Sequence, residues 1–163
     1  RYSWAVMELS RVLDVLRAFG RERVEYVLVG GVALALHGLV RATQDIDLFV
    51  APSPDNVERA KAALRSVFGD PSIDDIDAGD LEGAYPTVRF VPDDESFVID
   101  LIGRLGDAIR YEDLEVEERD VEGVRVRLAT PRTLYRMKRD TVRLIDRADA
   151  EALKRRFALE EDP

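Results

Sequence analysis

YVLVGGVALALHGLVRATQDIDLFV, residues 26–50, carries the strongest structural signals in this chain. It opens with a short β-branched run, passes through Gly30-Gly31 into the apolar segment 32–36, and closes with the run 45–50. Short β-branched runs bounded by glycine predict strands, and an apolar segment after a glycine turn predicts a buried helix. We therefore expect strand, tight turn, helix and second strand to form one compact unit.

Two aspartates occupy the second predicted strand, in Asp45-Ile46-Asp47. Because side chains alternate along a strand, both carboxylates lie on one face and Ile46 on the other. Aspartate is a poor strand former and neighbouring carboxylates repel, so the pair indicates a bound cation such as Mg²⁺, which prefers oxygen ligands. The alternative is a strand end that faces solvent.

A third carboxylate, Asp100, is the only charged group in the apolar run 97–102. An unpaired carboxylate in a buried strand costs free energy. If this strand lies beside Asp45 and Asp47, three carboxylates converge, and such a trio can hold two divalent ions on opposite sides of a phosphoryl group. The alternative is an ion pair between Asp100 and Arg89 or Arg104.

The Gly30-Gly31 pair precedes the predicted buried helix. A glycine pair at a strand-to-helix turn lets backbone N–H groups face an anion such as phosphate, but it also permits tight packing and nothing more. The nearby Asp45 and Asp47 favour the phosphate interpretation, because glycine turn and acidic strand then belong to one unit.

Further helices are expected on both sides of this unit. Apolar residues at three- and four-residue spacing predict helices over residues 3–19, 55–68 and 146–157. Thr130-Pro131 predicts the start of another, which carries Leu134, Met137 and Val142, because threonine is a good N-cap and proline suits the first helical position. Residues 107–113 predict one or two helical turns, and residues 70–84 a surface loop or a short helix.

Two hairpins complete the predicted elements, residues 87–91 with 96–102 and residues 114–121 with 124–128. Helices and hairpins in this order predict an α+β fold with a mixed β-sheet that helices cover mainly on one face. A doubly wound parallel sheet fits less well. The length of 163 residues predicts a single domain over 1–163, with a core at about 24–128 and a basic helical segment at about 130–158.

Composition excludes several chemistries. The chain has no cysteine and one histidine, which rules out disulfides, thiolate zinc sites, iron–sulfur clusters, a cysteine nucleophile and histidine-cluster metal sites. We expect His37, which lies among apolar residues, to be a packing residue and not a catalytic one. No apolar run is long enough to span a membrane and no signal peptide is recognisable, so a cytoplasmic location without membrane contact is expected.

Charge is distributed unevenly along the chain. Residues 1–123 carry 13 basic and 26 acidic side chains, whereas residues 124–163 carry 11 basic and 7 acidic ones. The basic C-terminal part predicts either ordinary solvated helix faces or a positive surface for the phosphates of a nucleotide or a nucleic acid. The low overall isoelectric point, about 4.7, argues against strong indiscriminate binding of nucleic acid.

Two motifs resemble the nucleotidyltransferase superfamily related to DNA polymerase β, in its branch of AbiEii-type toxin nucleotidyltransferases. The first is GGVALALHG at residues 30–38 followed by RATQDID at residues 41–47, and the second is MKRDTVR at residues 137–143 followed by Asp146 and Asp149. The resemblance implies a minimal palm-like sheet. It also implies Mg²⁺-dependent attack on the α-phosphate of a nucleoside triphosphate (NTP), with release of pyrophosphate.

The resemblance also implies roles for single residues. Asp45 and Asp47 would bind two Mg²⁺ ions, and Asp100 would be the third carboxylate and the general base on an attacking hydroxyl. The residues implied to bind nucleotide are Gly30, Gly31, Arg41, Thr43, Lys138 and Arg143. Thr43 either orients Asp45 through its hydroxyl or is a simple strand former, while Asp140, Asp146 and Asp149 are expected to pair with arginines at helical spacing and not with metal.

These implications predict an enzyme that moves a nucleoside monophosphate (NMP) from an NTP to a hydroxyl acceptor. A toxin that modifies tRNA, with a cognate antitoxin protein as partner, is the sharpest version. Two alternatives stay open. One is a nucleotidyltransferase for a small molecule or a protein, the latter as an antitoxin. The other is a nucleotide- or partner-binding module without catalysis, suggested by Gly31, where many relatives have serine.

Overall fold

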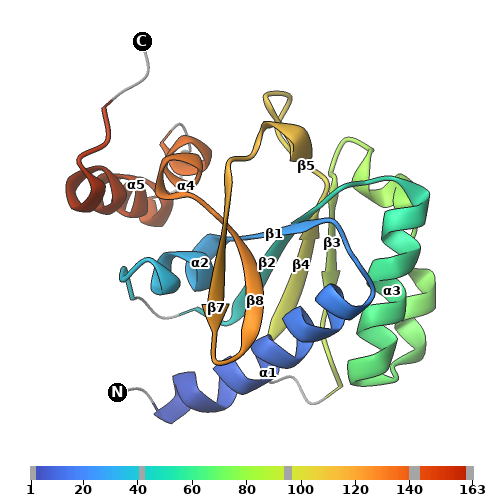
Figure 1. Cartoon of the computed structure of the whole chain (residues 1–163). Coiled ribbons are helices and arrows are strands. Elements are labelled where there is room, and N and C mark those ends of the chain that lie inside the picture. Colours follow the sequence, from blue (N-terminus) through green and yellow to red (C-terminus); the bar gives the residue numbers. More distant parts are fainter. Residues whose placement is uncertain (1–2, 41–42, 94–96, 140–143, 161–163) are drawn as a thin grey trace.

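A six-stranded mixed sheet forms the centre of the protein in a computed structural model, which describes residues 3–40, 43–93, 97–139 and 144–160 (Figure 1). The strand order is β3-β4-β2-β1-β8-β7, and β2 with β4 and β1 with β8 are the parallel pairs. The strands are β1 (Tyr26–Val29), β2 (Asp45–Val50), β3 (Thr87–Phe90), β4 (Val98–Ile102), β7 (Val116–Val121) and β8 (Val124–Ala129). The expected mixed α+β sheet is confirmed.

In the part of the chain that the structure describes, five α-helices pack around the sheet. They are α1 (Ser3–Arg21), α2 (Gly30–Leu36), α3 (Pro54–Phe68), α4 (Pro131–Lys138) and α5 (Leu144–Phe157). Helices α1 and α3 pack together over one face of the sheet, while α4 contacts α5 and α2 (Figure 1). None of the helices that the structure describes has the length and apolar character needed to cross a lipid bilayer.

The core lies between the sheet and the α1–α3 layer. Every residue of β1 is buried, and so are the last three of β2, which places these strands at the centre. Large buried apolar side chains from helices and strands contribute to it, among them Phe19, Leu48, Leu64 and Leu101. Burial of such side chains supplies most of the folding free energy, about 2 kcal/mol for each. The acidic end of β2 is thus attached to a rigid scaffold.

Local capping signals explain where the helices begin and end. Ser53 caps α3 by accepting a hydrogen bond from the Asn56 backbone N–H, and Gly69 ends the helix in the left-handed conformation with φ of 62°. Thr130 caps α4 in the same way. Helix α4 ends at Lys138, and Val142, which was expected within it, lies outside the described residues.

Two connecting segments differ in their agreement with expectation. Residues 70–84 form the short 3-10 helices η1 (Pro71–Asp75) and η2 (Ala78–Leu81), as one of the two expectations had it. The one or two helical turns expected at residues 107–113 are confirmed in part, as a single turn at the end of the segment. This segment contains β6 (Ile109–Arg110), paired with β5 (Arg104–Leu105), and the 3-10 turn η3 (Tyr111–Asp113). Gly106, with φ of 57°, makes the turn of this small hairpin.

Candidate active site

Asp45, Asp47 and Asp100 converge where β2 and β4 run side by side. The two strands are parallel, with Asp47 directly opposite Asp100. One carboxylate oxygen from each of the three lies within 4.8 Å of the others, a separation that a single divalent ion can bridge. The Asp100 side chain is 10% exposed and that of Asp45 is 41% exposed. The expected convergence of the three carboxylates is therefore present in the fold.

The pKa of Asp47 is raised by its position in this acidic triad. Its pKa is raised from 3.8 to about 7, first by burial and then by the charges of Asp100 and Asp45, while Lys138 lowers it. A carboxyl group that holds its proton to neutral pH has too little positive charge around it. The donor set of three hard oxygen ligands fits a divalent ion such as Mg²⁺, which would remove this repulsion.

The absence of a side chain at Gly30 leaves space for the Asp47 carboxylate. The residue has φ of 72°, and a Cβ atom there would collide with the Asp47 carboxylate. At Gly31 an added Cβ would lie 2.9 Å from the Cβ of Thr43. Both glycines are therefore required by close packing, as one of the two interpretations of the pair had it. Their predicted contact with phosphate stays a prediction.

Thr43 holds the start of β2 in place. Its hydroxyl is 3.3 Å from the Asp45 carbonyl oxygen, to which it donates, and 3.4 Å from the Asp45 backbone nitrogen. The hydroxyl thus fixes the backbone of Asp45 and contacts the glycine turn at the same time. It orients Asp45 through the main chain, and a role toward nucleotide stays a prediction.

Among the residues that the structure describes, Arg89 of β3 contacts two carboxylates of the acidic triad, those of Asp100 and Asp45. Its Nε and Nη2 lie 3.0 and 3.1 Å from the two oxygens of Asp100, and Nη2 lies 3.6 Å from Asp45. Of the two ion pairs considered for Asp100, the one with Arg89 exists. Arg104 instead donates to the backbone carbonyls of Glu82, Gly83 and Gly106. Arg89 was not predicted as a site residue, because only the β3–β4 register reveals that it lies opposite Asp100.

Lys138 projects from the last turn of α4 and influences the pKa of Asp47. Its Nζ lies 3.0 Å from carboxylate oxygens of both Asp146 and Asp149 on α5. These aspartates were expected to pair with arginines at helical spacing, and the lysine of another helix is a partner that the expectation missed. The implied nucleotide-binding residues Arg41 and Arg143 lie outside the described residues, as does Asp140.

His37 is a packing residue, as expected. Its Nε2 lies 2.8 Å from the Ala129 carbonyl oxygen, and its ring meets the Phe157 ring edge to face. The neighbouring backbone carbonyl groups at the end of α2 accept hydrogen bonds from Arg119 and Arg156. These contacts join α2 to β7, β8 and α5, and give His37 a structural explanation that needs no catalytic role.

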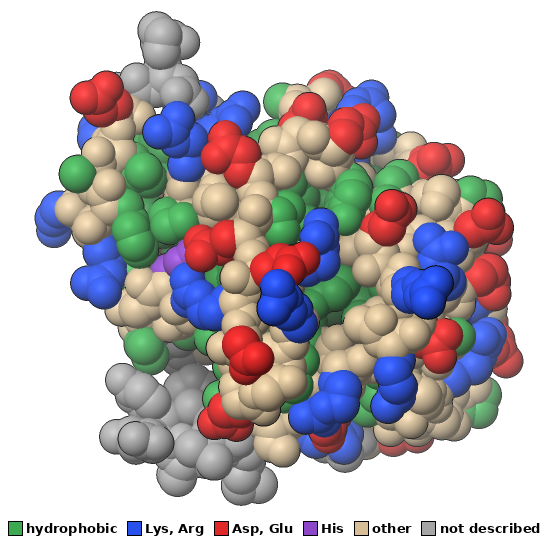
Figure 2. Space-filling model, viewed as in Figure 1, with side chains coloured by type: hydrophobic (Ala, Val, Ile, Leu, Met, Phe, Trp, Pro, Cys, Tyr) green, Lys and Arg blue, Asp and Glu red, His purple; other side chains and the backbone are tan. Residues whose placement is uncertain are grey.

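The basic C-terminal helices form a positive surface near the site. Figure 2 shows lysine and arginine side chains gathered over α4 and α5, the helices that carry Lys138 and its partners. The exposed arginines of these helices are Arg132, Arg136, Arg147, Arg155 and Arg156. The excess of basic residues in the C-terminal part of the sequence thus lies on the surface of α4 and α5.

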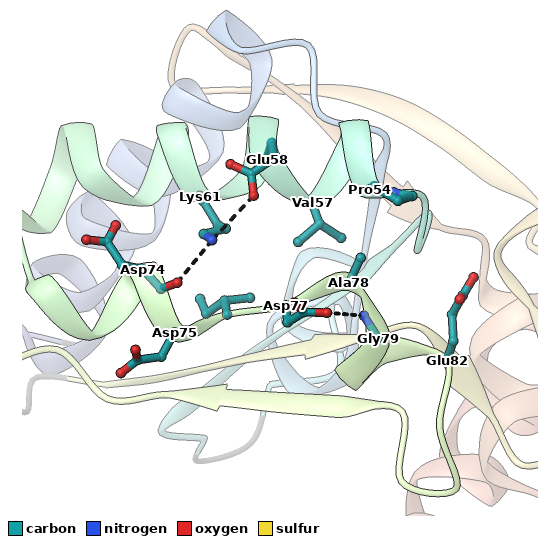
Figure 3. Close-up of a pocket in the computed structure, with 11 residues that line it drawn as sticks. Pro54, Val57, Glu58, Lys61, Asp74, Asp75, Asp77, Ala78, Gly79 and Glu82 are labelled. Carbon is teal, nitrogen blue, oxygen red and sulfur yellow. Dashed lines mark hydrogen bonds and ion pairs between the residues drawn. The ribbon is translucent and has the colours of Figure 1, made fainter.

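A second acidic cluster surrounds a cavity of about 390 Å³ between α3 and the 3-10 helices (Figure 3). It borders Pro54, which follows β2, so it lies at the opposite end of that strand from Asp45. Lys61 lies among its carboxylates, 3.4 Å from Glu58 and 3.2 Å from the Asp74 carbonyl oxygen. The members of this cavity cluster are Glu58, Lys61, Asp74, Asp75, Asp77 and Glu82.

Comparison with known proteins adds two findings. A family model described as "Nucleotidyl transferase AbiEii toxin, Type IV TA system" matches residues 11–149. Among solved structures, the chain is similar to a protein from Thermotoga maritima that is described as a candidate nucleotidyltransferase. The two share 16% identity over 93% of each chain, with a TM-score of 0.56, so this likeness concerns the fold. No curated protein matches the sequence.

Proposed function

The chain belongs to the AbiEii nucleotidyl transferase toxin family, and we propose that the acidic triad is where it transfers an NMP from an NTP to a hydroxyl acceptor. The observation that carries the proposal is the convergence of Asp45, Asp47 and Asp100, with ligand oxygens within 4.8 Å of one another. Membership of the family makes the chain a nucleotidyltransferase. The site, the metal and the acceptor are the proposed parts.

Asp45, Asp47 and Asp100 are the proposed ligands of two Mg²⁺ ions. Bound there, the ions would supply positive charge for the triphosphate and for the reacting oxygens. The raised pKa of Asp47 supports this part, because a site with excess negative charge favours a divalent cation. Asp100, whose side chain is 10% exposed, is the proposed acceptor of the proton from the attacking hydroxyl.

Nucleotide contacts are proposed on the side of the glycine turn and of α4. Gly30 and Gly31 would bring backbone N–H groups close to the phosphates, and Lys138 would bring positive charge. Thr43 lies against Gly31 and joins this group. Arg41 and Arg143 are also proposed to contact the nucleotide, on the basis of the family motifs alone.

RNA, and tRNA in particular, is the proposed acceptor. The positive surface of α4 and α5 supports it, because exposed arginines attract a phosphate backbone and Lys138 connects this surface to the triad. The family belongs to type IV toxin–antitoxin systems, so a cognate antitoxin protein is the proposed partner.

The decisive experiment combines binding with transfer. Isothermal titration of each NTP with and without Mg²⁺ is carried out on the wild type, on Asp47→Asn, and on Asp75→Asn as a matched control from the cavity cluster. The same proteins are then given α-labelled NTP and a tRNA pool. We expect Mg²⁺-dependent binding and labelling in the wild type and the control, and neither in Asp47→Asn. Labelling that survives in Asp47→Asn contradicts the proposed site, while labelled protein or small molecule in place of RNA contradicts the acceptor.

A further inference from the structure

Arg89 and a metal ion would satisfy the same need of the acidic triad. The Asp100 side chain is 10% exposed, so its carboxylate requires a positive partner. In the structure Arg89 is that partner, with one nitrogen on each Asp100 oxygen and a contact of 3.6 Å to Asp45. The guanidinium therefore lies against two of the three carboxylates that are proposed to bind metal.

The Arg89 side chain is also free to move away from the carboxylates. Its side chain is 60% exposed, and it projects from β3, which is the edge strand of the sheet and pairs with β4 alone. An arginine in this position turns toward solvent without opening the core, because its stem is not packed inside. The carboxylates, in contrast, are held by β2 and β4 within the sheet.

On the premise that the triad binds metal as proposed above, we infer that Arg89 is a resident counter-cation that the metal displaces. It keeps Asp45 and Asp100 in place in the metal-free protein and sets the metal affinity of the site by competition. A guanidinium in contact with Asp100 repels a divalent ion on the same carboxylate, so the arginine turns outward as the ion binds. Arg89 is a positioning residue, since it acts through the carboxylates.

The test is metal affinity, measured without nucleotide. Mn²⁺ is titrated by calorimetry at pH 8 into the wild type, Arg89→Gln, Arg89→Lys and Arg65→Gln. Arg65 is the matched control, an exposed arginine that makes two contacts with Asp74 far from the triad. We expect Arg89→Gln to bind Mn²⁺ about tenfold more tightly than the wild type. Arg89→Lys is expected between them, because it keeps the charge and loses the two-pronged contact, and Arg65→Gln is expected to match the wild type.

Thermal stability separates competition from an ordinary structural role. Without metal, Arg89→Gln is expected to melt below the wild type, and at saturating Mn²⁺ the difference is expected to vanish, because the ion then replaces the guanidinium. An unchanged or weaker Mn²⁺ affinity in Arg89→Gln overturns the inference and leaves the proposed metal site standing, as does a melting difference that persists at saturation. Absence of Mn²⁺ binding in every variant overturns both.

Discussion

The acidic triad and the cavity cluster are two groups of carboxylates at opposite ends of β2, and they differ in how their charges are balanced. In the cavity cluster, Asp74 is paired with Arg65 and Asp77 accepts a hydrogen bond from the Gly79 backbone N–H. In the triad, Asp47 is half-buried beside two other carboxylates, and its pKa is raised to about 7. A carboxyl group with a strongly raised pKa therefore indicates a functional site better than the number of acidic residues does.

The largest expected difference between the two groups is in catalysis. Asp45→Asn or Asp47→Asn is expected to lower nucleotidyl transfer by about a thousandfold or more, because each change removes a proposed metal ligand. Asp75→Asn, the same change in the cavity cluster, is expected to stay within about twofold of the wild type. Initial rates of pyrophosphate release measure both. Equal losses in the two groups would contradict the contrast, provided circular dichroism shows all variants folded.

Gly30 tests how tightly the triad is packed. Gly30→Ala is expected to lower the free energy of unfolding by about 3 to 4 kcal/mol, because the new Cβ adopts a strained φ and collides with the Asp47 carboxylate. The control is Gly69→Ala at the end of α3, where φ is 62° and nothing lies within 4 Å, so only about 1 kcal/mol is expected. Urea denaturation gives both values, and similar losses would mean that the Asp47 contact contributes little.

Two buried lysines offer the next comparison. Lys138→Met is expected to cost about 3 kcal/mol, because Asp146 and Asp149 are 15% and 9% exposed and lose a buried partner. Lys61→Met is expected to cost about 1 kcal/mol or less, because its partner Glu58 is 66% exposed and returns to water. Thermal denaturation of the two variants tests this order, and a larger loss of stability in Lys61→Met than in Lys138→Met would contradict it.

The smallest expected effect is a gain in stability. A carboxyl whose pKa rises on folding, here from 3.8 to about 7, binds its proton more tightly in the folded state, so it costs stability as pH rises through that interval. In metal-free protein, Asp47→Asn is therefore expected to gain about 2 kcal/mol over the wild type at pH 8 and nothing near pH 4. The rise in pKa sets a ceiling of about 4 kcal/mol. Urea denaturation at several pH values, with Asp75→Asn as control, measures this gain. A gain in stability that is the same at every pH would contradict the raised pKa of Asp47 as its cause.

Local signals made most of the fold predictable from sequence. Ser53-Pro54 and Thr130-Pro131 mark helix starts, and Glu122-Gly123 marks the turn of the β7–β8 hairpin, since each sets the backbone by its own chemistry. Within the segment 107–113 the strand β6 was not predicted, because two residues are too few to show an alternating pattern. This strand forms by pairing with Arg104 and Leu105 in a small hairpin across Gly106.

The candidate site was predictable where one strand carries it, and only partly predictable where the pairing of strands or the packing of helices decides. Alternation placed Asp45 and Asp47 on one face, and the lone charge of Asp100 indicated a partner. The pairing of Arg89 with Asp100 depends on the β3–β4 register, and that of Lys138 with Asp149 on how α4 packs against α5. Neither depends on a residue's sequence neighbours, so the sequence indicated Arg89 only as one of two candidate partners of Asp100 and did not indicate Lys138 as a partner of Asp149.

The parallel pairing of β1 with β8 also determines when the central sheet can be completed during synthesis of the chain. Leu28 lies opposite Leu128, so β1 waits for a neighbour that the ribosome makes 100 residues later. Such distant pairings form late in folding. Lys138 follows later still. A nascent chain that already contains Asp45, Asp47 and Asp100 therefore lacks β7 and β8, and the sheet around the proposed site is complete only after these strands have been made.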